Sequence, residues 1–380
     1  MQLVVASLIS GHVISTQARW TDSDVDGARI ITDAVVETDT GARVTVSELG
    51  GELDGFGQIS FPGPALLAPG MFVTVDAHDG VTLRGAHAMV VDDVAIDRVA
   101  GAGSSDPFVR EGPTPAGSYL FWPNGCIFMT YDAAGTTALS GDTEFPILDA
   151  AIATWNNGVA GCGYIKLMSA GKTSNHEVGK DYINLIKFRD TAWCIPATDT
   201  EPQHCHAAAA AGITTLTFIK HAGASDDGAI VDADVEINGV NFAITNGTSG
   251  GGKCAADLGN TITHELGHVL GLEHTCVTAD DPPRKDNNGN AVVACPSTDP
   301  LIFDATMYPY QTCGETKKKT LSDDDIAGAC AIYPTASDPK TCSAAQAPTG
   351  CCDASAAPGP SSLLLAGAIA MSFRKRRSRT

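Results

Sequence analysis

The chain has 380 residues and a net charge of −20 at pH 7, with a pI near 4.7. Its length leaves room for two or three domains. The acidic balance argues against nucleic acid as a partner and favours a repulsive, water-compatible surface. Twelve cysteines, none of them before Cys126, favour disulfides and therefore an oxidising compartment.

Residues 1–112 are expected to form a small all-β domain that ends in a linker. Gly and Asp-Gly turns separate short runs rich in β-branched residues. These runs are Ile30–Val36, Ala42–Glu48, Met71–Asp76 and Ala88–Val91. Leu3–Ile14 suits either a signal-peptide core or a first strand, and the lack of a preceding Lys or Arg favours the strand. Gly101–Gly117 is the candidate linker.

Residues 113–340 are expected to form an α+β domain. Strand-like runs occur at Ile127–Tyr131, Tyr182–Phe188 and Ile213–Ile219. Between the first two runs, Phe145 to Gly158 reads as a helix, because Pro146 suits a first turn and a glycine follows the apolar face.

Ile230–Asn238 is predicted to be an edge strand that binds an extended substrate by β-augmentation. Asp232, Asp234 and Glu236 alternate with apolar residues, so the three carboxylates share one face. They are candidate ligands for structural Ca²⁺, and the alternative is a solvated acidic face.

The segment from His264 to His274 reads H-E-x-x-H-x-x-G-x-x-H. On a helix, His264 and His268 lie on one face, and Gly271 lets the chain turn so that His274 becomes a third ligand. Three protein ligands leave one position of a tetrahedral Zn²⁺ open to water, as a catalytic site requires. Glu265 is placed to act as general base on that water and then as general acid.

Two further segments follow the motif. Asp304–Tyr310 contains Met307 in a Met-Tyr-Pro run, and Tyr310 is a candidate for the substrate pocket. Ser322 and Asp325 form the pattern of a capping box at the start of a last helix.

Together these motifs resemble the metzincin metallopeptidases, and Met-Tyr-Pro followed by a tyrosine is similar to the matrixin branch. The resemblance covers roughly residues 117–335. It implies a mixed twisted sheet with a zinc-binding helix, Met307 beneath the metal as packing, and peptide bonds as the substrate. Matrixins usually carry a pro-segment whose cysteine blocks the zinc, but residues 1–125 contain no cysteine.

The cysteines suggest the pairs Cys126–Cys162, Cys194–Cys205 and Cys313–Cys330, with Cys254, Cys276 and Cys295 sharing partners, although sequence does not fix connectivity. A disulfide between Cys194 and Cys205, with the two histidines simply exposed, also explains His204-Cys205-His206 better than a second metal site does.

Residues 341–380 are expected to be a spacer and an anchoring tail. Cys351-Cys352 precedes a short apolar run, Ser362–Phe373, and the basic cluster that starts at Arg374. This order resembles the myxobacterial C-terminal sorting tag, which implies export and anchoring in the cell envelope. A disordered or amphipathic tail is the alternative.

The sequence therefore predicts an exported, extracellular or cell-surface, zinc-dependent endopeptidase that acts on protein or peptide substrates. The alternative is a non-catalytic surface adhesion or binding protein that retains a structural zinc helix. Sequence does not indicate the oligomeric state or the preferred peptide bond.

Overall fold

The structure of the chain is a computed structural model that describes residues 7–21, 27–61, 67–78, 82–87, 107–247, 251–278, 281 and 283–344. They belong to one compact unit, Met1–Gln346. The second unit, Ala347–Thr380, lies outside the described residues, and so does the sorting tag expected there. The strand expected at Ala88–Val91 also lies outside them.

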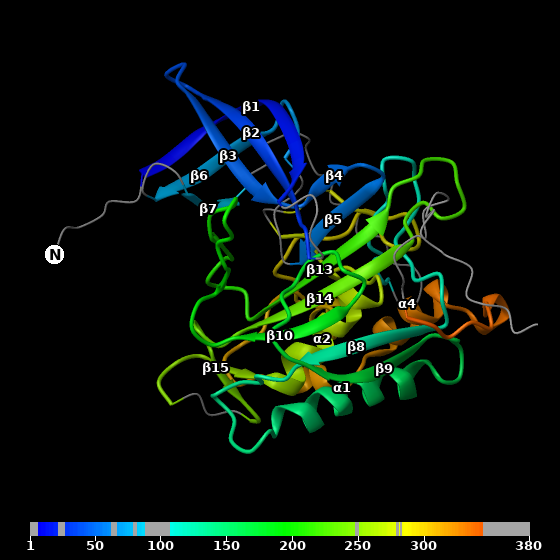
Figure 1. The fold of residues 1–380 in the computed structure, drawn as a ribbon. Helices are drawn as coiled ribbons and strands as arrows, with labels where there is room; N and C mark the ends of the chain where they lie inside the picture. Colours follow the sequence, from blue (N-terminus) through cyan, green and yellow to red (C-terminus); the bar gives the residue numbers. More distant parts are fainter. Residues whose placement is uncertain are drawn as a thin grey trace, which may run out of the picture. The chain divides into compact units, whose positions relative to one another are not determined.

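A seven-stranded mixed sheet carries the candidate site (Figure 1). Its order is β4-β5-β13-β14-β10-β8-β9. The strands are β4 (Gly51–Leu53), β5 (Phe56–Phe61), β8 (Cys126–Asp132), β9 (Lys166–Thr173), β10 (Asn184–Arg189), β13 (Gly212–Ile219) and β14 (Ile230–Asn238). Strands β14, β10, β8 and β9 are parallel, whereas β13 is antiparallel to both β14 and β5.

The main core lies between this sheet and two helices, α1 (Glu144–Val159) and α2 (Leu258–Val269). Side chains of a strand alternate between the two faces of a sheet. In β14, Ala233, Val235 and Ile237 belong to this core, and the acidic residues that alternate with them point to the other face. Trp155 of α1 packs in the same core and is 1% exposed. The predicted helix at residues 145–158 is confirmed.

An antiparallel five-stranded sheet of order β3-β2-β1-β6-β7 is built from residues that precede the linker. Its strands are β1 (Ser7–Trp20), β2 (Ile30–Thr38), β3 (Arg43–Leu49), β6 (Phe72–His78) and β7 (Thr82–His87). The strands expected from residues 30, 42 and 71 onward are confirmed. Strand β1 covers the second half of Leu3–Ile14, as the strand interpretation of that segment requires.

The boundary between the two sheets does not coincide with the domain boundary expected near residue 112. Strands β4 and β5 precede residue 112, yet they extend the seven-stranded sheet through the pairing of β5 with β13. The side-chain amide of Gln58 joins the two sheets, since its Oε1 accepts from Ile30 N at 2.9 Å and its Nε2 donates to Thr217 Oγ1 at 3.1 Å. The sheet of the candidate site therefore includes residues from both sides of the expected boundary.

The prediction that Ile230–Asn238 is an edge strand is wrong. This segment is β14, which pairs with β13 on one side and with β10 on the other. Alternation of polar and apolar residues shows which face of a strand is buried, but it does not show how many neighbours the strand has. Here both faces are buried, because another part of the chain covers the acidic side.

Short elements complete the described fold. They are β11 (Cys194–Ile195), β12 (His204–Cys205), β15 (Ala243–Thr245), β16 (Ala255–Asp257), α3 (Pro300–Phe303), η1 (Lys317–Lys319), α4 (Asp323–Ile332) and η2 (Thr335–Ser337). The predicted capping box is confirmed at the start of α4, where Ser322 and Asp325 bond reciprocally to each other's backbone N–H groups.

Five disulfides link described residues: Cys126–Cys342, Cys162–Cys330, Cys194–Cys205, Cys254–Cys313 and Cys276–Cys295. Of the predicted pairs, Cys194–Cys205 is confirmed, and Cys126–Cys162 and Cys313–Cys330 are wrong. The confirmed pair closes a local hairpin, whereas the cysteines of the two wrong pairs have partners at least 59 residues away along the chain. Five disulfides fit an oxidising, extracellular environment.

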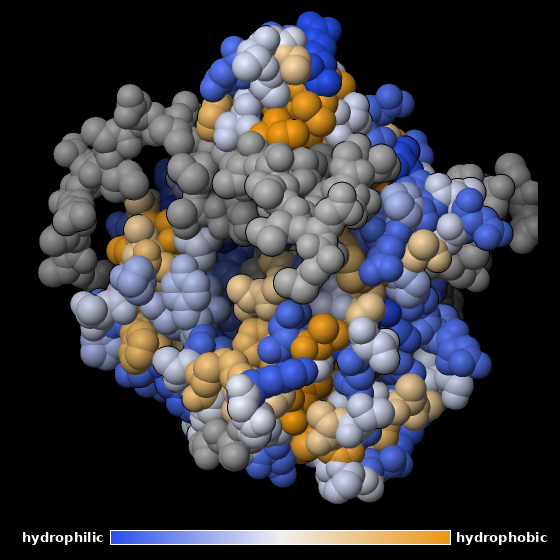
Figure 2. Space-filling view, turned by 90° about the vertical axis from the view of Figure 1, so that its left-hand side faces the viewer, coloured by the Kyte–Doolittle hydropathy of each residue, from blue (hydrophilic) through white to orange (hydrophobic). Residues whose placement is uncertain are grey.

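Within the described part of the chain, no helix is long and apolar enough to cross a bilayer. Figure 2 shows apolar residues interspersed among hydrophilic ones over much of the described surface on this side.

Candidate metal centre

Helix α2 is capped at its N-terminus and anchored along its length by α1. Asp257 caps it, and its carboxylate accepts from Asn260 N at 2.9 Å. The indole of Trp155 donates to Thr263 O at 2.8 Å, so α1 fixes α2 one residue before the first histidine. After Leu270 the chain turns at Gly271, whose φ of 87° is accessible to glycine with little strain. This turn brings His274 back toward the helix.

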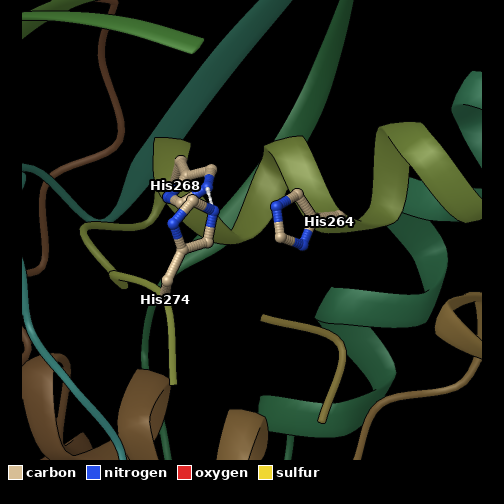
Figure 3. Close-up of side chains that lie close together, drawn as sticks. All are labelled: His264, His268 and His274. Carbon is tan, nitrogen blue, oxygen red and sulfur yellow. Dashed lines mark hydrogen bonds between the residues drawn. The ribbon is translucent and has the colours of Figure 1, made fainter. Parts of the chain in front are cut away.

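The side chains of the three histidines lie close together, as Figure 3 shows. His264 and His268 project from the same side of α2, and His274 approaches from the segment that follows the turn. One ring nitrogen of each residue lies within 4.8 Å of those of the other two. Nε2 of His268 and Nε2 of His274 are 3.2 Å apart. Among the residues that the structure describes, this is the one group of such side chains with metal-ligand spacing.

Hydrogen bonds on the opposite ring nitrogens set the tautomers. Nδ1 of His264 donates to Thr306 O at 2.6 Å, and Nδ1 of His268 donates to Leu272 O at 2.9 Å. For His274, Nδ1 lies 3.4 Å from a carboxylate oxygen of Glu273. A carbonyl only accepts, so Nδ1 of His264 and Nδ1 of His268 carry the hydrogen, and Nε2 of each presents a lone pair.

Burial keeps the imidazoles neutral. It lowers the pKa of His268 to about 4, and it lowers the pKa values of His264 and His274 well below the ordinary range. Lys318 and the neighbouring imidazoles act in the same direction on His264 and His274. Neutral imidazole is the form that binds a metal ion.

Glu265 is buried beside the triad, and its carboxylate is oriented by β13. Its Oε2 accepts from Thr214 Oγ1 at 2.7 Å. A Cβ at Gly212 would lie 2.6 Å from Oε1, so the glycine provides the space that the carboxylate occupies. Burial raises the pKa of Glu265 to about 8, against the opposing effects of the Thr214 hydrogen bond and of Lys318. A carboxyl group with a pKa near neutrality suits reversible proton transfer.

Met307 packs directly against helix α2. A Cβ at Gly267 would lie 2.2 Å from Met307 Sδ, so the thioether contacts the backbone of α2 between two histidines. Asp325 fixes this turn, because its carboxylate accepts from Thr306 N at 2.9 Å and from Met307 N at 3.1 Å. The same Thr306 carbonyl orients His264, so the start of α4 supports a candidate ligand.

His264, Glu265 and His274 line a cavity of about 1100 Å³, whose walls come from distant parts of the chain. Tyr310 lies on this wall and is 47% exposed, which agrees with its predicted place in the pocket. Lys318 also lines the cavity, and the sequence analysis missed it. Burial lowers the pKa of Lys318 to about 8, and its ammonium donates to the Tyr308 carbonyl. Lys318 lies in the run Lys317-Lys318-Lys319, and nothing in the sequence distinguishes it from its two neighbours.

The acidic residues of β14 make contacts unlike those of a calcium site or of a solvated face. Asp232 accepts from the backbone of Asp181 and Tyr182, and Asp234 accepts from Gly179 N and Leu185 N. Glu236 pairs with Arg189 and His206. All three are at most 3% exposed, so the solvated-face interpretation is wrong. Their oxygens anchor a loop and an arginine, which gives the calcium prediction no support.

The disulfide interpretation of His204-Cys205-His206 is confirmed by the Cys194–Cys205 bond. His204 lies 3.8 Å from Glu201 and His206 lies 3.2 Å from Glu236, and both rings face away from solvent. The prediction that these histidines are simply exposed is wrong.

In comparisons with known proteins, no protein-family model matches the chain, and no curated protein matches it significantly.

Proposed function

We propose that the chain is a zinc-dependent endopeptidase of the metzincin class. One observation carries this proposal: Nε2 of His268 and Nε2 of His274 lie 3.2 Å apart, with the third imidazole beside them. Two ligands at about 2.0–2.1 Å from one tetrahedral zinc ion lie roughly 3.3 Å apart. The spacing of His268 and His274 therefore suits a shared zinc ion.

The donor set fits zinc in its chemistry as well as in its spacing. His264, His268 and His274 would hold the ion through Nε2, and the carbonyls and the carboxylate on Nδ1 would keep the rings in place. Zinc bound there would supply a Lewis acid, which makes water more acidic and a peptide carbonyl more electrophilic.

Glu265 would take a proton from the attacking water and later deliver it to the leaving amine. Its raised pKa favours holding the proton between these two events. Thr214 would hold the carboxylate in one orientation through both. A structural zinc site has no use for such a carboxylate, so Glu265 favours catalysis over the alternative of a non-catalytic adhesion or binding protein.

An extended peptide would enter the cavity beside the triad, with Tyr310 and Lys318 on its wall. The five disulfides support an exported protein, and anchoring through the C-terminal tail remains part of this proposal. Calcium is not part of it.

A casein zymogram of the purified full-length protein tests the proposal. We expect a cleared band that disappears with a zinc chelator and returns when zinc is added back. A protein that binds zinc but clears no casein and cleaves no peptide library would instead support the adhesion or binding alternative.

A further inference from the structure

Lys318 places a buried positive charge in the wall of the cavity. The residue is 2% exposed, and its backbone N–H donates to Asn260 Oδ1 at 2.8 Å, which ties η1 to α2. Its charge lowers the pKa values of both His264 and Glu265. A fixed cation therefore acts on the part of the cavity that adjoins the candidate metal centre.

This cation has no ion pair within the described part of the chain. Its Nζ donates to the Tyr308 carbonyl, and no described carboxylate contacts it. Burial lowers the pKa of Lys318 to about 8 against the attraction of Glu315, so the charge is incompletely compensated. A buried charge without a counter-ion is costly, and a ligand that brings a negative charge offsets that cost.

Two neutral hydrogen-bond donors line the cavity beside Lys318. Thr261 precedes His264 by three residues on α2, and its buried Oγ1 has no hydrogen-bond partner among the described residues. Gln311 is held by Asn260, which also bonds to Lys318: Oε1 of Gln311 accepts from Asn260 Nδ2 at 2.9 Å. An ammonium, a hydroxyl and an amide Nε2 can all donate, and the oxygens of a carboxylate can only accept.

We propose that Lys318, Thr261 and Gln311 form a subsite for a carboxylate group of the substrate, so that the protein selects peptides with Asp or Glu near the scissile bond. The inference rests on the proposed function and adds a substrate class to it. Charge-assisted hydrogen bonds to a carboxylate are stronger than neutral ones. The net charge of −20 repels an acidic peptide at long range, but salt screens that repulsion beyond about 10 Å, whereas the ammonium acts at contact.

Paired peptides test this selectivity on the full-length, zinc-loaded protein. They are amidated, internally quenched peptides that differ only in one Glu or Gln, placed in turn at each position around the bond cleaved in casein. At one position we expect kcat/KM to be roughly tenfold or more higher for Glu than for Gln. Lys318→Met should bring this ratio to about one. The ratio compares two peptides on one protein, so a general loss of activity cancels.

Lys317→Met is the matched control. It removes the same charge from the adjacent residue, whose Nζ lies 3.4 Å from Asp304 Oδ1 and which does not line the cavity. Its Glu-to-Gln ratio should equal that of the wild type. If Lys318→Met fails to fold, Lys318→Gln keeps a donor for the Tyr308 carbonyl and should also lose the preference. Equal rates for Glu and Gln at every position in the wild type, or an unchanged ratio in the Lys318 variants, would overturn the proposal.

A further pair of peptides identifies the source of the carboxylate. Both lack Asp and Glu, and one ends in a free carboxylate whereas the other is amidated. A preference for the free terminus that Lys318→Met removes would assign the subsite to a terminal carboxylate. A preference seen only with the Glu peptides would assign it to a side chain.

Binding separates the subsite from the peptidase function. In fluorescence anisotropy with zinc-free protein, a dye-labelled Glu peptide should bind about tenfold more tightly than its Gln counterpart, and Lys318→Met should abolish the difference. If this holds while no peptide is cleaved, the subsite stands and the proposed peptidase function fails. If peptides are cleaved with no preference for a carboxylate, the peptidase function stands and the subsite fails.

Discussion

The hydroxyl of Thr214 donates to Oε2 of Glu265 at 2.7 Å, so a strand that pairs with the N-terminal part of the chain also orients the candidate general base. This bond favours the charged carboxylate, against the burial that raises the pKa of Glu265 to about 8.

Thr214→Val removes this bond with little change of shape, and the pKa of Glu265 should rise further. A hydrogen bond to a charged group contributes about 1.5–3 kcal/mol, which corresponds to roughly one to two pH units. The acidic limb of the kcat/KM profile should move to higher pH by that amount. Thr215→Val, one residue further on β13, should leave the limb in place; equal shifts in both variants would contradict the assignment.

Glu265→Gln should change how the stability of the zinc-free protein depends on pH. The pKa of Glu265 is about 8 in the folded chain and ordinarily about 4.5, so between these values the folded state binds the extra proton. Its stabilising contribution is complete below pH 4.5 and is lost as the pH rises through 8.

Glutamine does not titrate, so the wild type should lose stability relative to Glu265→Gln by roughly a few kcal/mol between pH 5 and pH 8. Urea unfolding of both chelator-treated proteins at pH 5, 6.5 and 8 measures this difference. A constant difference across the three pH values would show that the carboxyl group has no raised pKa.

Asp325→Asn should weaken both the fold and the metal centre. The carboxylate accepts from the backbone N–H groups of Thr306 and Met307, and the Thr306 carbonyl orients His264. We expect a loss of about 1–3 kcal/mol in the free energy of unfolding and a weaker affinity for zinc. Asp323→Asn, at an exposed position in the first turn of the same helix, is the control. Equal zinc affinity in the wild type and in Asp325→Asn would contradict this role.

The Cys254–Cys313 disulfide should contribute more to stability than Cys194–Cys205. The two bonds span 59 and 11 residues, and loop-closure entropy gives about 4 and about 3 kcal/mol respectively. Replacing both cysteines of each pair by serine and measuring urea unfolding tests this order. A reversed order would indicate that contacts around the short hairpin, and not chain entropy, dominate.

The sequence predicted the parts of the site that depend on local spacing. His264, His268 and His274 lie within eleven residues, and a helix with a glycine turn brings them together. The capping box of Ser322 and Asp325 is local in the same way. The helix at residues 145–158 and most strands were also predicted from patterns within single segments.

Sequence did not predict the parts that depend on tertiary pairing. Ser60 and Thr215 are 155 residues apart, and Cys126 and Cys342 are 216 residues apart, so no local pattern connects either pair. For the same reason the sequence predicted an edge strand at β14, although β14 pairs with β13 on one side and with β10 on the other. Lys318 enters the cavity only because η1 packs beside α2.

The central claim is that three imidazoles hold one zinc ion while Glu265 acts on water beside it. The most direct test is peptide cleavage by Glu265→Ala compared with the wild type, both at measured zinc content. We predict one zinc ion per chain in both proteins and loss of cleavage in Glu265→Ala. Cleavage by Glu265→Ala at the wild-type rate, with zinc bound, would contradict the claim.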